Sequence, residues 1–249
     1  MKLVCIGDSF TEGLCDVTRP DGEYLGWADR VAAALAPVEY ANLAVRGKLF
    51  DQILADQVPV ALDLQPDVVT FHAGGNDVLR RGTDLDDLFA RYNAVVGELV
   101  EPGRTVLLFT CLTRAGGTGR LADLIAERFE AFNANVRATA SAHGARVVDL
   151  EEITALSDRR FWYTDRLHLN PEGHKRVAAA VLDVLGRGTG DWYRQPLPEV
   201  RTSRRAALLA DVAWVNGHFV PWIWRRVRGV SSGDGRVAKD ATMRSVPPQ

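Results

Sequence analysis

Short apolar runs alternate with longer segments of helical periodicity along most of the 249-residue chain, and this alternation constrains the fold more than any other feature. Such runs predict buried strands, and the segments between them predict helices. Strands are predicted at residues 2–6, 38–43, 67–72, 104–110 and 145–149. Helices are predicted at residues 23–36, 47–63, 85–100, 120–143 and 171–185. The pattern is typical of an α/β fold with a parallel sheet covered on both faces.

We predict a flavodoxin-like three-layer sandwich in which the parallel five-stranded sheet has the order 2-1-3-4-5, followed by a C-terminal helical extension. In this order the first strand lies between the second and third strands. The chain changes direction across the sheet at that point, and open α/β sheets bind their ligands outside the strand ends there. Polar residues that follow the first and third strands are therefore the first candidates for a functional site.

A serine follows the first predicted strand directly, in the segment Gly7-Asp8-Ser9-Phe10-Thr11. The backbone turns there, so the Ser9 hydroxyl is expected at the carboxyl end of the sheet. A serine in such a turn is either a nucleophile or a helix cap, and this segment alone favours neither function.

An aspartate and a histidine lie three residues apart in a loop before the last predicted helix, at Asp165 and His168. Asn170 and Pro171 mark the start of that helix. The spacing can place the carboxylate and the imidazole on one side of a turn, where the carboxylate would orient the imidazole. A serine hydroxyl is a weak nucleophile until such a base accepts its proton.

Two further segments follow predicted strands and offer hydrogen-bond donors. Gly47 comes after the second strand, and Asn76 lies in Gly74-Gly75-Asn76-Asp77 after the third. A glycine allows its backbone N–H to approach a ligand closely, and an asparagine donates from its side-chain amide. Both are donor types found in oxyanion holes.

With these segments the chain resembles the SGNH (GDSL) hydrolase family, whose four name-giving residues correspond in order to Ser9, Gly47, Asn76 and His168. The resemblance covers residues 1–187 and departs from the family's other name at Phe10, where that name has leucine. It implies Ser9 as nucleophile, His168 as base and Asp165 as its partner. It also implies an oxyanion hole formed by the amides of Ser9, Gly47 and Asn76.

On this basis the chain is expected to be a serine esterase that hydrolyses carboxylic esters through an acyl-enzyme, with no cofactor and no metal. Two alternatives stay open. An acyltransferase would use the same three residues with an acceptor hydroxyl in place of water, and a non-catalytic interaction module would act through the C-terminal extension. The expected partners are small-molecule, lipid or carbohydrate esters.

A second glycine motif competes weakly with this interpretation. Residues 117–122 fit the pattern G-x-G-x-x-A of dinucleotide sites, but they do not follow their strand directly, and that strand is the fourth. We expect a mobile active-site loop there instead. No serine lies in a G-x-S-x-G segment, which argues against the α/β-hydrolase class.

Other polar residues near these motifs are assigned structural roles. His174 is expected to be an exposed helix-start residue rather than a zinc ligand beside Asp165 and His168. His72 is expected to be neutral and hydrogen-bonded within the packing, and Cys111 to be buried and inert.

Composition excludes several classes of protein. The formal net charge is −2, which gives no indication of nucleic-acid binding. The three cysteines form neither an even disulfide framework nor a metal pair with CxxC spacing. The first predicted strand begins at residue 2, so no secretory signal is recognised, and a cytoplasmic location is expected.

The composition changes near residue 190, which divides the chain into a hydrolase domain at 1–190 and a basic, tryptophan-containing extension at 191–249. Residues 194–249 carry a net charge of +6 against −8 for the rest. A helix is predicted at about 203–216, with Leu208, Leu209, Val212 and Trp214 packed on the domain, and disorder from about 231. Peripheral membrane contact through this extension is the less favoured alternative to docking on the core.

Overall fold

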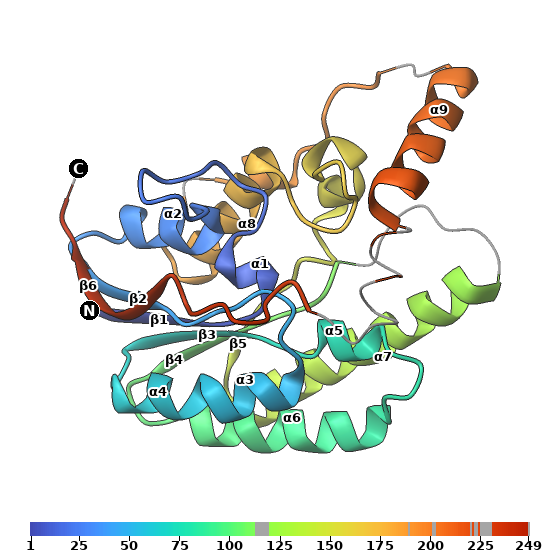
Figure 1. Cartoon of the computed structure of the whole chain (residues 1–249). Helices are drawn as coiled ribbons and strands as arrows, with labels where there is room; N and C mark the ends of the chain where they lie inside the picture. The colour runs from blue at the N-terminus through green and yellow to red at the C-terminus, as the bar shows by residue number, and fades with distance from the viewer. Residues whose placement is uncertain are drawn as a thin grey trace.

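A single mixed sheet runs through the protein in the order β5-β4-β3-β1-β2-β6 (Figure 1). The computed structural model describes residues 1–112, 120–188, 190–200, 203–219, 221, 224 and 231–248. The strands are β1 (Lys2–Gly7), β2 (Val38–Asn42), β3 (Val68–His72), β4 (Thr105–Phe109), β5 (Arg146–Val148) and β6 (Asp240–Val246). The first five strands are parallel and have the predicted order 2-1-3-4-5. The predicted α/β fold is confirmed, and one strand is added to it.

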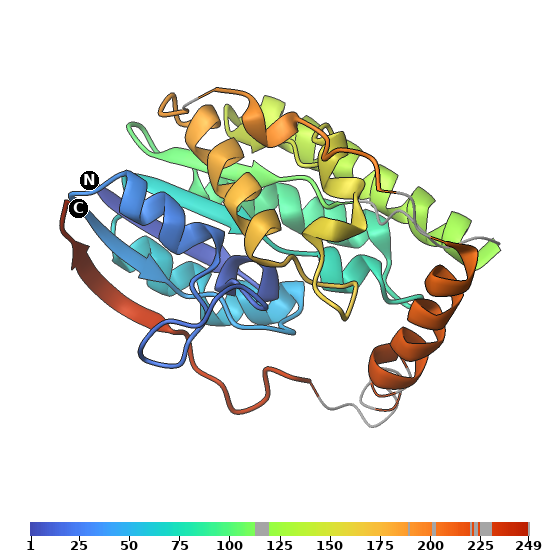
Figure 2. The ribbon, with the colours of Figure 1, turned by 90° about the horizontal axis from the view of Figure 1, so that it is seen from above.

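Helices cover both faces of the sheet, as Figures 1 and 2 show. One face carries α2 (Gly26–Ala34) and α8 (Pro171–Val184), which pack on each other. The other face carries α3 (Phe50–Asp56), α4 (Val58–Asp63), α6 (Leu85–Leu99) and α7 (Arg120–His143). Short helices α1 (Ser9–Glu12) and α5 (Gly75–Val78) follow β1 and β3, and α9 (Arg204–Trp214) belongs to the extension.

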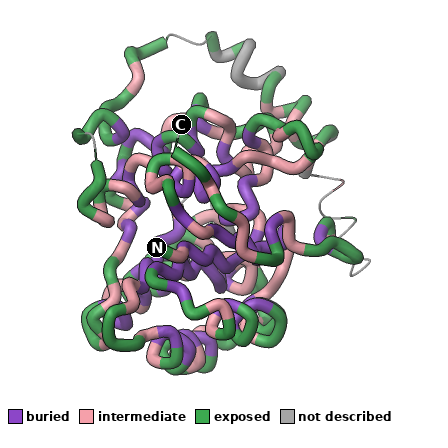
Figure 3. Tube along the Cα trace, turned by 90° about the vertical axis from the view of Figure 1, so that its left-hand side faces the viewer, coloured by how far each residue is buried: buried purple, intermediate pink, exposed green. Residues whose placement is uncertain are grey.

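Alternate residues of each strand fill two separate apolar cores. Val4 and Ile6 of β1 pack in the core under α3, α6 and α7, whereas Leu3 and Cys5 face α2 and α8. Figure 3 shows the buried residues gathered in the interior of the molecule and the exposed ones at its periphery. A strand buried on both faces is a continuous apolar run in the sequence, which explains why the sequence predicts these strands.

The prediction of a single helix at 47–63 is wrong, because the structure has two helices there. α3 ends at Asp56 and α4 begins at Val58, with Pro59 in its first turn. Proline has no N–H to donate to the preceding turn, so it ends one helix and is tolerated at the start of the next.

The disorder predicted from residue 231 is contradicted by β6. This strand pairs antiparallel with the edge strand β2, with Val38 opposite Val246 and Asn42 opposite Asp240. A seven-residue strand from the extension thus covers the β2 edge of the core sheet, which is otherwise available for pairing with other chains.

Buried charges attach β6 to the core. The Lys239 side chain is only 1% exposed, and its Nζ donates to the Asp29 carboxylate and to the Tyr24 and Leu25 carbonyl oxygens. Arg19 Nη1 lies 2.9 Å from Asp29 and 2.8 Å from Asp240. Every donor of the buried ammonium group therefore has an acceptor, which is what burial of a charge requires.

The predicted helix of the extension is present as α9, and Trp214, one of the residues expected to pack on the domain, contacts the Asp165 loop. Both views show it standing apart from the two helix layers (Figures 1 and 2). Val212, one of the residues expected on its buried face, is 52% exposed. The side chains of Leu208 and Leu209 lie outside the described residues. Among the described residues, no helix has the length and apolar character needed to span a membrane.

Candidate active site

Ser9 is the first residue of α1, at the carboxyl end of β1. β1 ends at Gly7, whose φ is +154°, and a side chain there would lie 2.6 Å from the His72 carbonyl oxygen. Asp8 caps the short helix by accepting a hydrogen bond of 3.1 Å from the Phe10 N–H. The strand, the tight glycine turn and the cap together fix the position of the Ser9 hydroxyl.

Asp165 and His168 lie in a turn that one carboxylate oxygen organises. Asp165 Oδ1 accepts hydrogen bonds from the backbone N–H groups of Leu167 at 2.9 Å and His168 at 3.0 Å. The other oxygen, Oδ2, lies 2.7 Å from His168 Nδ1. The three-residue spacing thus brings both side chains to one side of the turn, as the sequence predicts.

The imidazole of His168 joins this turn to α1. His168 Nε2 lies 3.1 Å from Ser9 Oγ, although the two residues are 159 positions apart in the chain. Burial opposes the charge of the Asp165 carboxylate, but the hydrogen bonds from His168 and from the backbone lower its pKa to about 2. Asp165 is therefore ionised at neutral pH and accepts the Nδ1 proton, which leaves Nε2 as the acceptor toward Ser9.

Asn76 lies beside this array, on α5. Its side-chain Nδ2 donates to Asp8 Oδ2 at 3.1 Å and to the Lys48 carbonyl oxygen at 3.0 Å. Asn76 lines the same pocket as Ser9 and His168. The loop after β3 therefore brings this amide to the carboxyl end of β1, as the strand order requires.

Gly47 takes a different position from the other predicted residues. It has a φ of +75°, and a side chain there would lie 2.2 Å from Ser231 Oγ of the C-terminal segment. Among the described residues, those that line the pocket include Ser9 and Asn76 but not Gly47. Close approach of another chain segment, as well as its backbone conformation, therefore restricts this position to glycine.

A model of the GDSL-like lipase/acylhydrolase family matches residues 5–176. The chain belongs to this family. The match includes Ser9, Gly47, Asn76, Asp165 and His168 and leaves the C-terminal extension outside it. Family membership makes the protein a hydrolase of the esterase and lipase class.

Solved structures share the fold of this family member. A variant of Axe2, an acetyl xylan esterase from Geobacillus stearothermophilus, matches with a TM-score of 0.62 at 21% identity, over 76% of this chain and 96% of its own. A lipase/acylhydrolase from Enterococcus faecalis matches with a TM-score of 0.61 at 22% identity, over 75% of this chain and 96% of its own. TesA matches with a TM-score of 0.59 at 21% identity, over 74% of this chain and 98% of its own. A search of curated proteins found no match.

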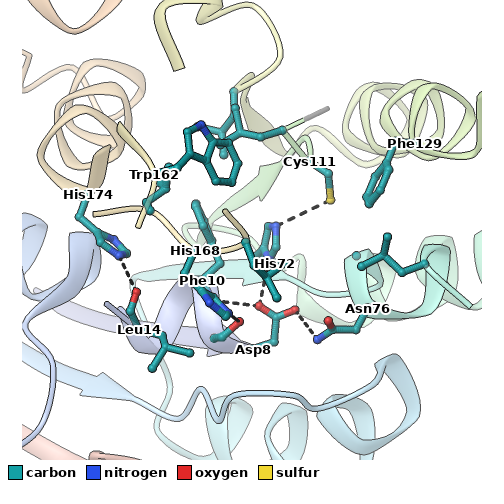
Figure 4. Close-up of a pocket in the computed structure, with 17 residues that line it drawn as sticks. Asp8, Phe10, Leu14, His72, Asn76, Cys111, Phe129, Trp162, His168 and His174 are labelled. Carbon is teal, nitrogen blue, oxygen red and sulfur yellow. Dashed lines mark hydrogen bonds and ion pairs between the residues drawn. The ribbon is translucent and has the colours of Figure 1, made fainter. Parts of the chain in front are cut away.

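The pocket of this GDSL-family protein is a cavity of about 120 Å³ that Ser9 helps to line. Figure 4 shows other residues of its wall, among them His168 and Asn76. Apolar side chains form much of its wall, among them Phe10, Phe129 and Trp162. Residues 113–119 lie outside the described residues, so only residues 120–122 of the G-x-G-x-x-A segment, where the sequence predicts a mobile loop, are described, and they begin α7. The aromatic wall fits a pocket that takes an apolar group with one reactive polar end.

His174 is buried, and the prediction that it is exposed is wrong. It is 1% exposed, and its Nε2 lies 3.2 Å from the Leu14 carbonyl oxygen. Burial lowers its pKa to about 4, so it is neutral at pH 7. In the described part of the chain, the group with metal-ligand spacing is Cys15, Asp165 and His168 instead. A cation there would compete with the hydrogen bond between His168 and Asp165.

Three residues to which the sequence analysis assigned no role at the site contact it. Cys15 Sγ lies 3.8 Å from Asp165 Oδ2, and the Trp214 indole N–H donates to the Asp165 carbonyl oxygen at 2.8 Å. Ser231 lies against Gly47. Cys15 follows the Ser9 segment closely enough to have been considered. Trp214 and Ser231 give no local signal, because their contacts depend on where the extension folds back.

Proposed function

We propose that this protein hydrolyses carboxylic esters through an acyl-enzyme formed on Ser9. The observation that carries the proposal is the continuous chain of contacts from Ser9 Oγ to His168 Nε2 at 3.1 Å and from His168 Nδ1 to Asp165 Oδ2 at 2.7 Å. Nucleophile, base and orienting acid must lie within hydrogen-bond reach in this order for a serine to attack a carbonyl.

In the proposed reaction, His168 accepts the Ser9 proton as Ser9 Oγ attacks the ester carbonyl carbon. Asp165 stabilises the imidazolium that forms, and His168 then donates the proton to the departing alcohol. A water molecule, deprotonated by His168, releases the acyl group in the second half-reaction. The mechanism needs no cofactor.

The negative oxygen of the tetrahedral intermediate would be held by the Ser9 backbone N–H and the Asn76 side-chain amide, whose residues line the pocket, whereas the third predicted donor, Gly47, is not among the described residues that line it. Asn76 Nδ2 donates to Asp8 and to the Lys48 carbonyl oxygen in the free protein. The developing oxyanion would replace one of these acceptors, so the donor is already held at the site. The hydrogen bond that remains would keep the amide in place, which limits the reorganisation that the transition state requires.

The size of the pocket favours a short acyl group. A cavity of about 120 Å³ accommodates only a few carbon atoms, and the similar protein Axe2 is an acetyl xylan esterase. A series of p-nitrophenyl esters from acetate to decanoate tests this preference. Added alcohol acceptors in the same assay distinguish acyl transfer, which makes a new ester, from hydrolysis.

Labelling with a fluorophosphonate tests the nucleophile directly. The serine oxygen displaces fluoride from phosphorus, and the adduct is located by mass spectrometry of peptides. We expect the adduct on Ser9, its loss in Ser9→Ala, and unchanged labelling in Ser157→Ala, which alters an exposed serine in the turn before the Asp165 loop. An adduct on any other serine would contradict the proposal.

A further inference from the structure

A cysteine, a histidine and an aspartate lie in line at the floor of the pocket. Cys111 Sγ lies 3.8 Å from His72 Nε2, and His72 Nδ1 lies 3.6 Å from Asp8 Oδ1 (Figure 4). The three residues follow or end β4, β3 and β1, so the sheet itself brings them to one edge. Ester hydrolysis as proposed above uses neither His72 nor Cys111.

His72 is held as a buried cation. It is 9% exposed, and its ring packs on Phe10 with 4.5 Å between ring centroids. Burial opposes the charge, but Asp8 and Cys111 together raise the pKa of His72 to about 10. The prediction that His72 is neutral is therefore wrong, because the sequence does not reveal that Asp8 faces it.

An imidazole ring held against a sulfur, with a carboxylate on the other side of the ring, is an arrangement that activates a nucleophilic thiol. His72 Nδ1 has no hydrogen-bond partner at normal distance, although it is buried. The ring is thus tied to Asp8 through charge at 3.6 Å and directs its other nitrogen toward Cys111. This arrangement of thiol, imidazole and carboxylate parallels that of Ser9, His168 and Asp165.

The other two cysteines lie in the opposite electrostatic environment. Burial raises the pKa of the Cys5 thiol to about 12. Burial and the Asp165 carboxylate likewise raise the pKa of Cys15 to about 12, although Cys15 is the more accessible of the two. Accessibility alone would make Cys15 the most reactive thiol, but the Asp165 carboxylate beside it opposes its ionisation.

Cys111 is reached through the pocket. It is 6% exposed, and it lines the same cavity of about 120 Å³ as Ser9. The prediction that Cys111 is buried holds, but its exposed part faces a cavity rather than packed side chains. A small neutral molecule that enters the cavity would therefore meet both Ser9 and Cys111.

We propose that Cys111 is a second nucleophile of this pocket, activated by His72 and Asp8, and is a modification site for small disulfides and soft carbon electrophiles. With a disulfide, the thiol proton goes to water, the sulfur attacks one disulfide sulfur, and the S–S bond breaks. The departing thiolate takes a proton from water, which leaves a mixed disulfide on Cys111. The adduct fills the cavity and blocks ester hydrolysis, and this last consequence alone rests on the proposed function.

Brief treatment of the full chain with iodoacetamide, followed by peptide mass spectrometry, measures the reactivity of each cysteine. The sulfur attacks the CH₂ carbon, and iodide leaves. We expect Cys111 to be alkylated about tenfold faster than Cys15, and Cys5 to stay unmodified. Equal or faster alkylation of Cys15 would overturn the proposal.

His72→Gln tests the activating role of the imidazole. Glutamine keeps a polar side chain at this position but cannot carry a positive charge. We expect alkylation of Cys111 to slow by about tenfold, with the rate at Cys15 unchanged. A rate at Cys111 within about twofold of the unmutated protein would overturn the proposed activation. The order of reactivity in the unmutated protein remains a test even if this variant does not fold.

The effect on hydrolysis is measured with 2-hydroxyethyl disulfide. Unmutated protein should lose p-nitrophenyl acetate hydrolysis in step with the adduct on Cys111 and regain it with dithiothreitol, whereas Cys111→Ser should keep the activity with which it starts. An adduct on Cys111 with unchanged hydrolysis would overturn the block. A protein that never hydrolyses esters would contradict the proposed function instead, and the alkylation rates would still decide the status of Cys111.

Discussion

Different kinds of interaction stabilise the parallel core and attach the C-terminal extension to it. In the core, apolar side chains from β1, β3 and β4 pack against helices on both faces of the sheet. The extension contributes one edge strand, a buried lysine and a tryptophan that contacts the Asp165 loop. Burial of apolar area thus builds the core, whereas a few directional contacts attach the extension.

The two regions also contribute differently to the candidate site. The core supplies Ser9, Asn76 and His168, whose side chains line the pocket. The extension places Trp214 on the Asp165 backbone and Ser231 against Gly47. The comparison suggests a division in which the core performs the chemistry and the extension holds the loops that surround it. The following predictions test that division, from the largest expected effect to the smallest.

Ser9→Ala should lower ester hydrolysis by about 10³-fold or more, because it removes the hydroxyl that His168 contacts and that would form the acyl-enzyme. His168→Ala should have a comparable effect, since nucleophile and base act as a unit. Ser157→Ala is the matched control, and it should change kcat by less than about twofold. Steady-state kinetics with p-nitrophenyl acetate measures all three. Turnover by Ser9→Ala near the unmutated rate would show that the core does not use this serine.

Lys239→Ala tests whether the extension is part of the cooperative fold. Removing the buried ammonium group leaves Asp29 with Arg19 and Arg244 and leaves the Tyr24 and Leu25 carbonyls without this donor, at a cost of about 2–4 kcal/mol. The melting temperature should fall by roughly 5–15 °C.

Arg236→Ala is the control for charge, because it removes an exposed cation from the same segment. Its melting temperature should stay within about 2 °C of the unmutated protein. If Lys239→Ala melts like this control, the extension adds nothing to the stability of the core.

The sequence predicts the core well for a physical reason. Strands buried on both faces must be apolar throughout, and the loops that carry Ser9, Asn76 and His168 follow strand ends or precede a helix cap. These signals are local, so they can be read without knowing the contacts. The adjacency of β1 and β3 then follows from the strand order.

The extension could not be predicted in the same way. β6 has the sequence DATMRSV, which contains no apolar run. It forms a strand because its backbone pairs with the β2 edge and its Arg244 forms an ion pair with the buried Asp29. The charge of His72 and the burial of His174 depend likewise on groups distant in sequence, namely Asp8 and the Leu14 carbonyl. Contacts between distant residues are set by tertiary structure and leave no periodic signal.

Asn76→Ala should lower kcat by about 10²-fold with a smaller change in KM, because an oxyanion donor acts mainly in the transition state. Asn93→Ala, which removes an exposed amide from α6, is the control and should leave kcat within about twofold. A change confined to KM would place Asn76 in substrate binding. Loss of kcat would support the view that the chemistry belongs to the core.

The rate of hydrolysis should depend on pH through a single group. Only a neutral imidazole can accept the Ser9 proton, so kcat/KM should fall by about tenfold per pH unit on the acid side of the profile. Asp165, with its pKa lowered to about 2, stays ionised over this range and adds no second step between about pH 4 and 8. Two titrations in the acid limb would show that a further group, outside the proposed array, controls the reaction.

Trp214→Phe should have the smallest effect and sharpens the comparison most, since it changes the contact of the extension with the active-site loop. The indole N–H donates to the Asp165 carbonyl oxygen at 2.8 Å, and the Arg166 guanidinium lies 4.9 Å from the ring centroid. Phenylalanine keeps an aromatic ring for Arg166 but cannot donate a hydrogen bond. Without the donor, the Asp165 turn should hold His168 less well, and kcat should fall by roughly three- to tenfold, equivalent to about 1 kcal/mol, with KM nearly unchanged.

Two variants on the same segment separate this effect from a general loosening of α9. Val215→Ala removes a side chain that is 39% exposed, and Asp211→Asn removes the ion pairs with Arg159 and Arg166. Exposed ion pairs contribute little to stability, and truncating a half-exposed side chain removes little packing. Both variants should therefore keep kcat within about twofold. If Trp214→Phe lowers kcat no more than these two, the extension stabilises the protein without positioning its catalytic loop. If Trp214→Phe lowers kcat and the two other variants do not, the positioning of Asp165 depends on a residue beyond the core.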